Sequence, residues 1–96
     1  MKARTLTFGD FAPHRGKPFK VEAQNGAIQL LLTEAQELPG SIRDGGAFRL
    51  EFHGPRQPTL PQGTYRFLVG GQPAEIFIVP IGPAAGEKLR YEAIFY

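Results

Sequence analysis

The segment from Leu60 to Gly82, which reads LPQGTYRFLVGGQPAEIFIVPIG, constrains the fold of this chain more than any other. Residues 63–69 alternate between aromatic or apolar and mixed positions, which predicts a strand with one inward face. Gly70-Gly71 can adopt positive φ, as a tight hairpin turn requires. Residues 74–79 then predict the return strand, and Pro80 is expected to end it because proline has no N–H to donate. The chain is therefore expected to be organised around a β-hairpin.

The return strand of this hairpin is apolar on both faces. Phe77 and Val79 point to one side, and Ile76 and Ile78 point to the other. Such a strand is either covered on both sides or leaves one face open to a partner. The usual burial of these residue types favours the first interpretation, and the second stays open.

Four further segments show the period-two alternation of half-buried strands. They are 18–23, 27–34, 48–53 and 89–96, so the chain is expected to hold six strands in meander order. Segment 27–34 also fits helical spacing, but Asn25-Gly26 before it is a strong hairpin signal and favours a strand. The polar, glycine-rich connection 37–47 is the longest stretch without expected structure, which makes it a natural place for binding or for plain mobility.

No segment predicts a helix long enough to connect parallel strands, so the sheet is expected to be mostly antiparallel. We therefore expect an all-β fold, either a small six-stranded barrel or a two-layer sandwich. Leu6–Pro13 is the one plausible helical turn, since Thr7 and Asp10 have capping-box spacing. Phe8 and Phe11 would share a face of this turn and cap one end of the barrel.

The length and composition limit the classes of protein to consider. Ninety-six residues predict a single β-barrel-like domain over 1–96. The net charge of +2 produces only a weak field. The chain has no cysteine, its start lacks the apolar run of a signal peptide, and no stretch approaches a membrane span. These features lead us to expect a cytoplasmic location and no membrane association.

The residue types that carry catalysis or bind metals are sparse. His14 and His53 have no second ligand-type residue at metal spacing, and the only serine, Ser41, lies in a glycine-rich connection without the flanking pattern of a nucleophile. Acidic residues on the expected strands have the outward phase of surface charges, although Glu75 is a candidate for a partly buried acid. We therefore expect no enzyme activity, no cofactor and no metal site.

Nucleic-acid binding by a small barrel requires aromatic and basic residues on the same exposed face. Here Phe48, Phe52 and Phe67 follow the core phase, whereas Arg49 and Arg66 fall on the opposite face. Because stacking and charge are separated in this way, we expect no nucleic-acid partner.

Four large apolar residues fall opposite the main core phase, namely Leu31, Leu68, Ile94 and Tyr96. If they form an outer patch, it is a candidate interface with a protein partner or with a second copy of the chain. The leading expectation is a non-enzymatic protein-interaction or assembly accessory domain. The alternative is a small-ligand or carbohydrate-binding β-barrel that uses its mouth and the 37–47 connection.

Four motifs together resemble a known family. They are F-x-x-x-x-G-x-x-F at 11–19, LPQGTY at 60–65, IFIVPIG at 76–82 and YEAIF at 91–95. The set is similar to a small bacterial family of single-domain all-β proteins described only as a domain of unknown function. Its members are often encoded near phage-tail-collar-like proteins, so the resemblance implies an accessory or assembly role, for example in a phage-tail-like assembly. It implies no activity and no catalytic residue.

Overall fold

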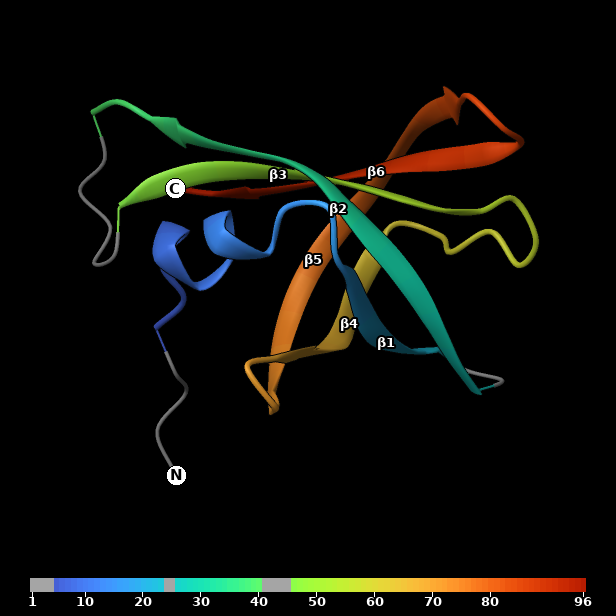
Figure 1. The fold of residues 1–96 in the computed structure, drawn as a ribbon, viewed down its shortest axis with the longest axis horizontal. Coiled ribbons are helices and arrows are strands. Elements are labelled where there is room, and N and C mark those ends of the chain that lie inside the picture. The colour runs from blue at the N-terminus through green and yellow to red at the C-terminus, as the bar shows by residue number, and fades with distance from the viewer. Residues whose placement is uncertain (1–4, 24–25, 41–45) are drawn as a thin grey trace.

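A computed structural model of the chain describes residues 5–23, 26–40 and 46–96. It contains six strands, and each strand runs antiparallel to the strands it pairs with. Their bounds are β1 Pro18–Ala23, β2 Gly26–Leu38, β3 Ala47–Pro55, β4 Gly63–Val69, β5 Gln72–Ala84 and β6 Lys88–Phe95. In the order β1-β2-β3-β6-β5-β4 they close into a barrel (Figure 1). The expected all-β antiparallel fold is confirmed, and the structure is the barrel of the two expected architectures.

The two longest strands, β2 and β5, each change partner along their length. β2 pairs with β1 up to Leu31 and with β3 from Leu31 onward, and its register shifts by one residue between Leu32 and Glu34. β5 pairs with β4 up to Ile78 and with β6 from Val79 onward. An extra residue on one strand bends that strand and increases its twist. The barrel therefore consists of two halves that share β2 and β5 at its corners.

Two predictions about β5 are wrong, and both make the strand longer than expected. Pro80 does not end the strand, because it lies in register with Tyr91 and β5 continues to Ala84. The register shifts directly after Pro80, and proline is tolerated where a ladder is interrupted in this way. At the other end, β5 begins directly after Gly70-Gly71, whose φ angles of 60° and 79° fit a two-residue hairpin turn.

The inward phases of the strands meet in an aromatic core. Phe19, Phe52 and Phe67 follow one another through the barrel, with ring centroids 5.9 Å and 5.2 Å apart in turn. Tyr91 is fully buried, and its hydroxyl accepts a hydrogen bond of 2.9 Å from the backbone N–H of Leu60. This contact ties the segment after β3 to the middle of the barrel.

The predicted N-terminal cap is present as two short 3-10 turns, η1 at Phe8–Asp10 and η2 at Ala12–His14. The Asp10 carboxylate accepts a 2.8 Å hydrogen bond from the N–H of Thr7, as the capping-box spacing predicted. Phe11 is fully buried, and its ring centroid lies 5.9 Å from that of Phe19, 5.8 Å from that of Phe48 and 6.1 Å from that of Phe95. These contacts close the end of the barrel where β1 begins and β6 ends.

The other expectations about the connections have mixed outcomes. Segment 27–34 is a strand, as expected, and it extends to Leu38. Ala23 faces Gly26 across the first hairpin, while Asn25 lies outside the described residues. Positions 41–45 of the 37–47 connection also lie outside them. In the described part of the chain, no helix has the length and apolar character needed to cross a membrane.

Candidate functional site

The four candidate interface residues all lie on the outside of the barrel. The exposed fraction is 39% for Leu31, 36% for Leu68, 41% for Ile94 and 78% for Tyr96. All four side chains are therefore accessible to a partner. Their role in binding stays a prediction.

The structure divides these four residues into two groups. Leu31 on β2 faces Pro18 on β1, and Leu68 on β4 faces Pro73 on β5. Leu68 and Pro18 also line one hollow of about 150 Å³, so this first group runs across the outer side of neighbouring strands. Ile94 and Tyr96 belong to the last strand and its end, and they form part of a second group.

Phe77 is a further exposed apolar residue, and the sequence analysis did not include it in the candidate set. Its exposed fraction is 51%, while its neighbours Ile76 and Ile78 are buried. Val79 on β5 pairs with Glu92 on β6. Phe77 lies two residues before Val79, and Ile94 lies two residues after Glu92, so the two side chains have the same outward phase. Phe77, Ile94 and Tyr96 are called the terminal patch below.

The two-residue turn could have identified Phe77 from the sequence. A tight Gly70-Gly71 turn places Val69 opposite Gln72 and, six residues on, Gly63 opposite Ile78. That register puts Ile76 on the inward face with Phe67 and leaves Phe77 outside. The expected return strand, 74–79, does not use this register, because it starts two residues after the observed strand.

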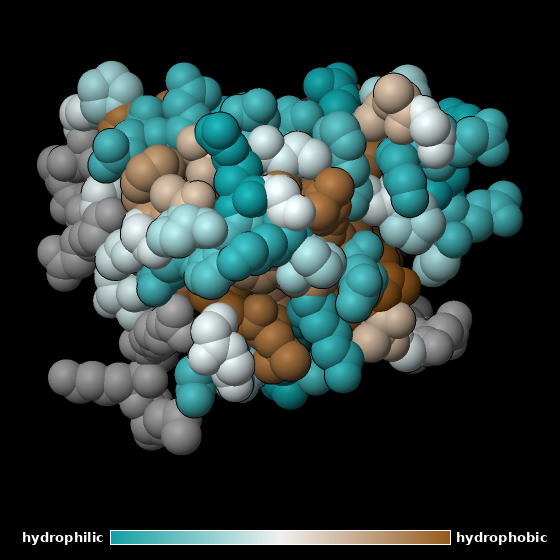
Figure 2. Space-filling model, in the orientation of Figure 1, coloured by the Kyte–Doolittle hydropathy of each residue, from teal (hydrophilic) through white to brown (hydrophobic). Residues whose placement is uncertain are grey.

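Apolar surface is visible on the face drawn in Figure 2, in the region where the β4–β5 hairpin lies in Figure 1, and polar surface surrounds it. The row between Leu68 and Phe77 on the outer side of this hairpin is polar. There Arg66 lies 3.6 Å from Glu75 and 3.8 Å from Glu22. These are exposed ion pairs, so they contribute little to stability, but they balance charge beside the apolar residues.

The outer side of β3 and β6 carries a second, denser charge network. Arg49 contacts Glu92 at 2.7 Å and Glu51 at 3.2 Å, and Glu51 also lies 3.3 Å from His53 and 3.9 Å from Arg90. Arg49 separates the negative charges of Glu51 and Glu92, which face each other across the two strands. The network therefore joins β3 to β6 and leaves little unbalanced charge.

The ionisation of this network is set by its contacts. Burial opposes ionisation of Glu51, but hydrogen bonds from His53 and Arg49 and the charge of Arg90 outweigh it, so the pKa of Glu51 lies below its usual value. The hydrogen bond with Glu92 raises the pKa of Arg49 despite the cost of burial. Glu51 is thus held as a carboxylate engaged with cations, which suits a structural contact better than proton transfer.

The other residues considered for chemistry are dispersed. Glu75 is exposed on β5, as its outward phase predicted, and the alternative of a partly buried acid is wrong. His14 lies on η2 with its ring 6.2 Å from that of Phe19, whereas His53 belongs to the β3–β6 network. Ser41 lies outside the described residues. Within the described ranges, no three His, Asp or Glu side chains gather closely enough to hold a metal ion.

The aromatic residues of the core and two arginines of the same strands lie on opposite sides of the barrel wall. Phe48, Phe52 and Phe67 are fully buried, while Arg49 and Arg66 lie outside and engage in ion pairs. The rings of the core are therefore not available as a stacking surface beside these two arginines.

Comparison with known proteins connects this fold to one family. The profile of DUF6916, a domain of unknown function, matches residues 6–95. The chain belongs to the DUF6916 family. The match covers all six strands of the barrel and both N-terminal turns. No curated protein and no solved structure matched the chain.

Proposed function

We propose that this DUF6916 domain is a non-enzymatic protein-interaction domain that associates through the terminal patch. The observation that carries the proposal is the exposure of three large apolar side chains, Phe77 on β5, Ile94 on β6 and Tyr96 directly after β6. Soluble proteins rarely expose such side chains together unless the surface is functional. Leu31 and Leu68 extend the apolar surface as a separate group, and they are the matched comparison for the terminal patch.

The charges beside the terminal patch support a second copy of the chain as the partner. Ile94 faces Arg49 across β6 and β3, and Arg49 is already paired with Glu51 and Glu92. On the other flank, Arg66 is paired with Glu75. Because these charges are balanced within one chain, a symmetric contact between two copies brings together no net like charge. A partner of strong opposite charge gains little from the same surface.

The kind of assembly in which the domain associates, and its cellular location, are proposed on other grounds than the patch. An accessory or assembly role, phage-tail-like or at another surface assembly, rests on the family resemblance and on no feature of the barrel itself. The cytoplasmic location likewise stays a prediction. The absence of enzyme activity is supported by the paired state of Glu51 and by the dispersal of His14 and His53.

Sedimentation velocity over a range of protein concentrations tests the proposal. The wild-type chain is expected to form a concentration-dependent dimer, and Phe77→Ser with Ile94→Ser is expected to raise its Kd by about 10-fold or more, as loss of central apolar contacts does. Leu31→Ser with Leu68→Ser removes apolar groups of similar exposure from the other group and serves as the control. Circular dichroism verifies that both variants fold.

Two outcomes would overturn the proposal. A wild-type chain that stays monomeric at every concentration excludes self-association. A monomeric wild type could still bind another protein through the patch. If wild type and the Phe77→Ser/Ile94→Ser variant then retain the same proteins from a lysate, the terminal patch is not an interface with another protein either. Equal loss of dimer in both double variants would instead show that general surface apolarity, and not the terminal patch, drives association.

A further inference from the structure

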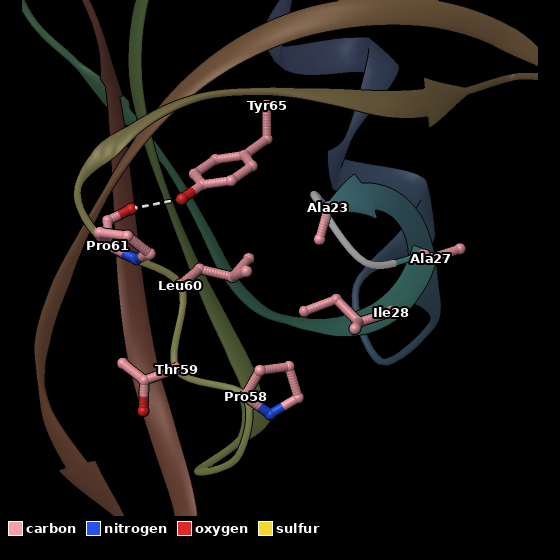
Figure 3. Close-up of a pocket in the computed structure, with 9 residues that line it drawn as sticks. Ala23, Ala27, Ile28, Pro58, Thr59, Leu60, Pro61 and Tyr65 are labelled. Carbon is pink, nitrogen blue, oxygen red and sulfur yellow. Dashed lines mark hydrogen bonds between the residues drawn. The ribbon is translucent and has the colours of Figure 1, made fainter.

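A cavity of about 460 Å³ opens at the end of the barrel opposite the N-terminal turns (Figure 3). It lies among the end of β1, the start of β2, the start of β4 and the segment that precedes β4. Its lining residues are Ala23, Gly26, Ala27, Ile28, Pro58, Thr59, Leu60, Pro61 and Tyr65. Pockets of roughly 300–1,000 Å³ are typical for small-molecule ligands. The size of the cavity is therefore adequate for a small organic ligand.

The closure of the barrel explains why the cavity lies at this position. β1 and β4 pair only at Val21–Phe67 and Glu22–Arg66. Ala23 and Tyr65 come next on the two strands, and they face the cavity instead of each other (Figure 3). Because Ala23 is small and points into the space, the inner side of the barrel wall leaves room there.

The rim of the cavity is held in place by hydrogen bonds. The N–H of Leu60 donates to the Tyr91 hydroxyl at 2.9 Å. The Tyr65 hydroxyl donates to the Pro61 carbonyl at 2.7 Å, as the dashed line in Figure 3 marks. Pro58 and Pro61 further restrict the backbone of this segment. A ligand would thus meet a site that is already ordered, and little conformational entropy would be lost on binding.

The chemistry of the lining defines what the cavity can hold. None of the lining residues that the structure describes is charged, so an ionic group would lose hydration without gaining a counter-charge from them. Hydrogen-bond donors are scarce as well, because the prolines lack an N–H, the Leu60 N–H is engaged and the Tyr65 hydrogen is engaged. What remains is aliphatic surface from Ile28 and Leu60, one tyrosine ring and a few acceptor oxygens. A carbohydrate, which needs many hydrogen bonds, fits this lining less well than an apolar molecule.

We propose that this cavity is a binding site for a small, uncharged, predominantly apolar ligand with an aromatic or alicyclic body. A single donor group on the ligand can reach the Tyr65 or carbonyl oxygens at the rim. The site is separate from the terminal patch, since Ile94 and Tyr96 lie at the other end of the barrel and Phe77 is exposed on the outer face of β5. The cavity also separates the two parts of the small-ligand alternative, the barrel mouth and the 37–47 connection. Leu38 and Ala47 of that connection pair with each other at the opposite end of the barrel, away from the cavity.

Fluorescence titration with a neutral naphthalene dye, 6-propionyl-2-(dimethylamino)naphthalene, tests this site. The expected result is saturable binding of one dye per chain with a blue-shifted emission. An anionic naphthalene dye, 1-anilinonaphthalene-8-sulfonate, is expected to bind at least about 10-fold more weakly, because the lining offers no counter-charge. Equal binding of both dyes would contradict the proposed ligand class.

A pair of phenylalanine substitutions on one hairpin locates the bound dye. Ala23→Phe fills the cavity and is expected to weaken binding at least about 10-fold. Gln29→Phe adds the same ring on the next strand at an exposed position that does not line the cavity, and it is expected to leave binding unchanged. If both variants bind the dye as the wild type does, or if Phe77→Ser with Ile94→Ser removes binding instead, the cavity is not the site.

Amide chemical shifts of the wild-type chain give a second measurement that needs no variant. Titration with the neutral dye is expected to shift the resonances of Ile28, Leu60 and Tyr65 and to leave those of Phe11 and Ile94 unchanged. Shifts concentrated at Ile94 and Phe77 would overturn the assignment. This result decides the proposal even if Ala23→Phe does not fold, and it is separate from the dimer measurement above.

Discussion

The two ends of the barrel are closed by different means. At the end with the N-terminal turns, Phe11 is fully buried against three aromatic rings. At the other end, the proline-containing segment 56–62 crosses the opening, and only Leu60 of its side chains is buried in the core. A cavity of about 460 Å³ remains beside it. One end is therefore filled by side chains, while the other is bridged by backbone and leaves space for a ligand.

The largest difference between the ends is expected on removal of the aromatic plug. Phe11→Ala removes a fully buried ring that contacts Phe19, Phe48 and Phe95, so it should lower the free energy of unfolding by about 3–5 kcal/mol. Phe8→Ala, at a half-buried position of the same turns, should cost clearly less. Urea unfolding measures both values. Equal costs for Phe8 and Phe11 would show that the end is not closed by one central ring.

The bridged end depends on a hydrogen bond more than on ring packing. Tyr91→Phe keeps the buried ring but leaves the Leu60 N–H without its partner, which should cost about 1–2 kcal/mol. Tyr65→Phe is the matched control, since its hydroxyl donates to the exposed Pro61 carbonyl and water can replace it. Denaturant unfolding and amide exchange at Leu60 measure the effect. A neutral Tyr91→Phe would mean that this segment is held by packing alone.

The charge network on β3 and β6 belongs to neither end and should have the smallest effect. The folded-state pKa of Glu51 is lowered, so its stabilisation is present above the unfolded pKa of about 4.3 and is lost as pH falls through the folded pKa. Glu51→Gln should therefore lower the free energy of unfolding by about 1 kcal/mol at pH 7. Below the folded-state pKa of Glu51 the same substitution should cost almost nothing. Thermal unfolding across pH measures the difference.

An exposed glutamate on the neighbouring strand provides the control for this measurement. Glu37→Gln on β2 removes the same charge from an exposed position and should change stability little at any pH. A Glu51→Gln cost that persists unchanged at low pH would show that shape, and not ionisation, makes position 51 important.

Most of the fold could be predicted from local patterns. Alternation identified all six strands, and the glycine turns identified where the chain reverses. The capping spacing of Thr7 and Asp10 together with Phe8 and Phe11 identified the end with the N-terminal turns. These signals are local, because each depends on neighbours within a few residues along the chain.

The features that could not be predicted depend on contacts between distant segments. Pro80 has the local signature of a strand end, but the partner of β5 changes at that point and the strand continues. The cavity likewise arises where β1 and β4 cease to pair, which no single strand pattern reveals. For the candidate interface, the outward phase of Leu31, Leu68, Ile94 and Tyr96 was readable, whereas Phe77 required the hairpin register.

The short β1–β4 joint also has a consequence for the motions of the protein. It has two register pairs, whereas the β3–β6 ladder has eight. Sub-global opening of a folded protein requires the least free energy where the fewest contacts must be broken. The β1–β4 joint is thus where the ring would part first, with β2 and β5 still spanning both halves. Since the cavity lies at the end of this joint, the same opening would widen the path by which a ligand enters and leaves.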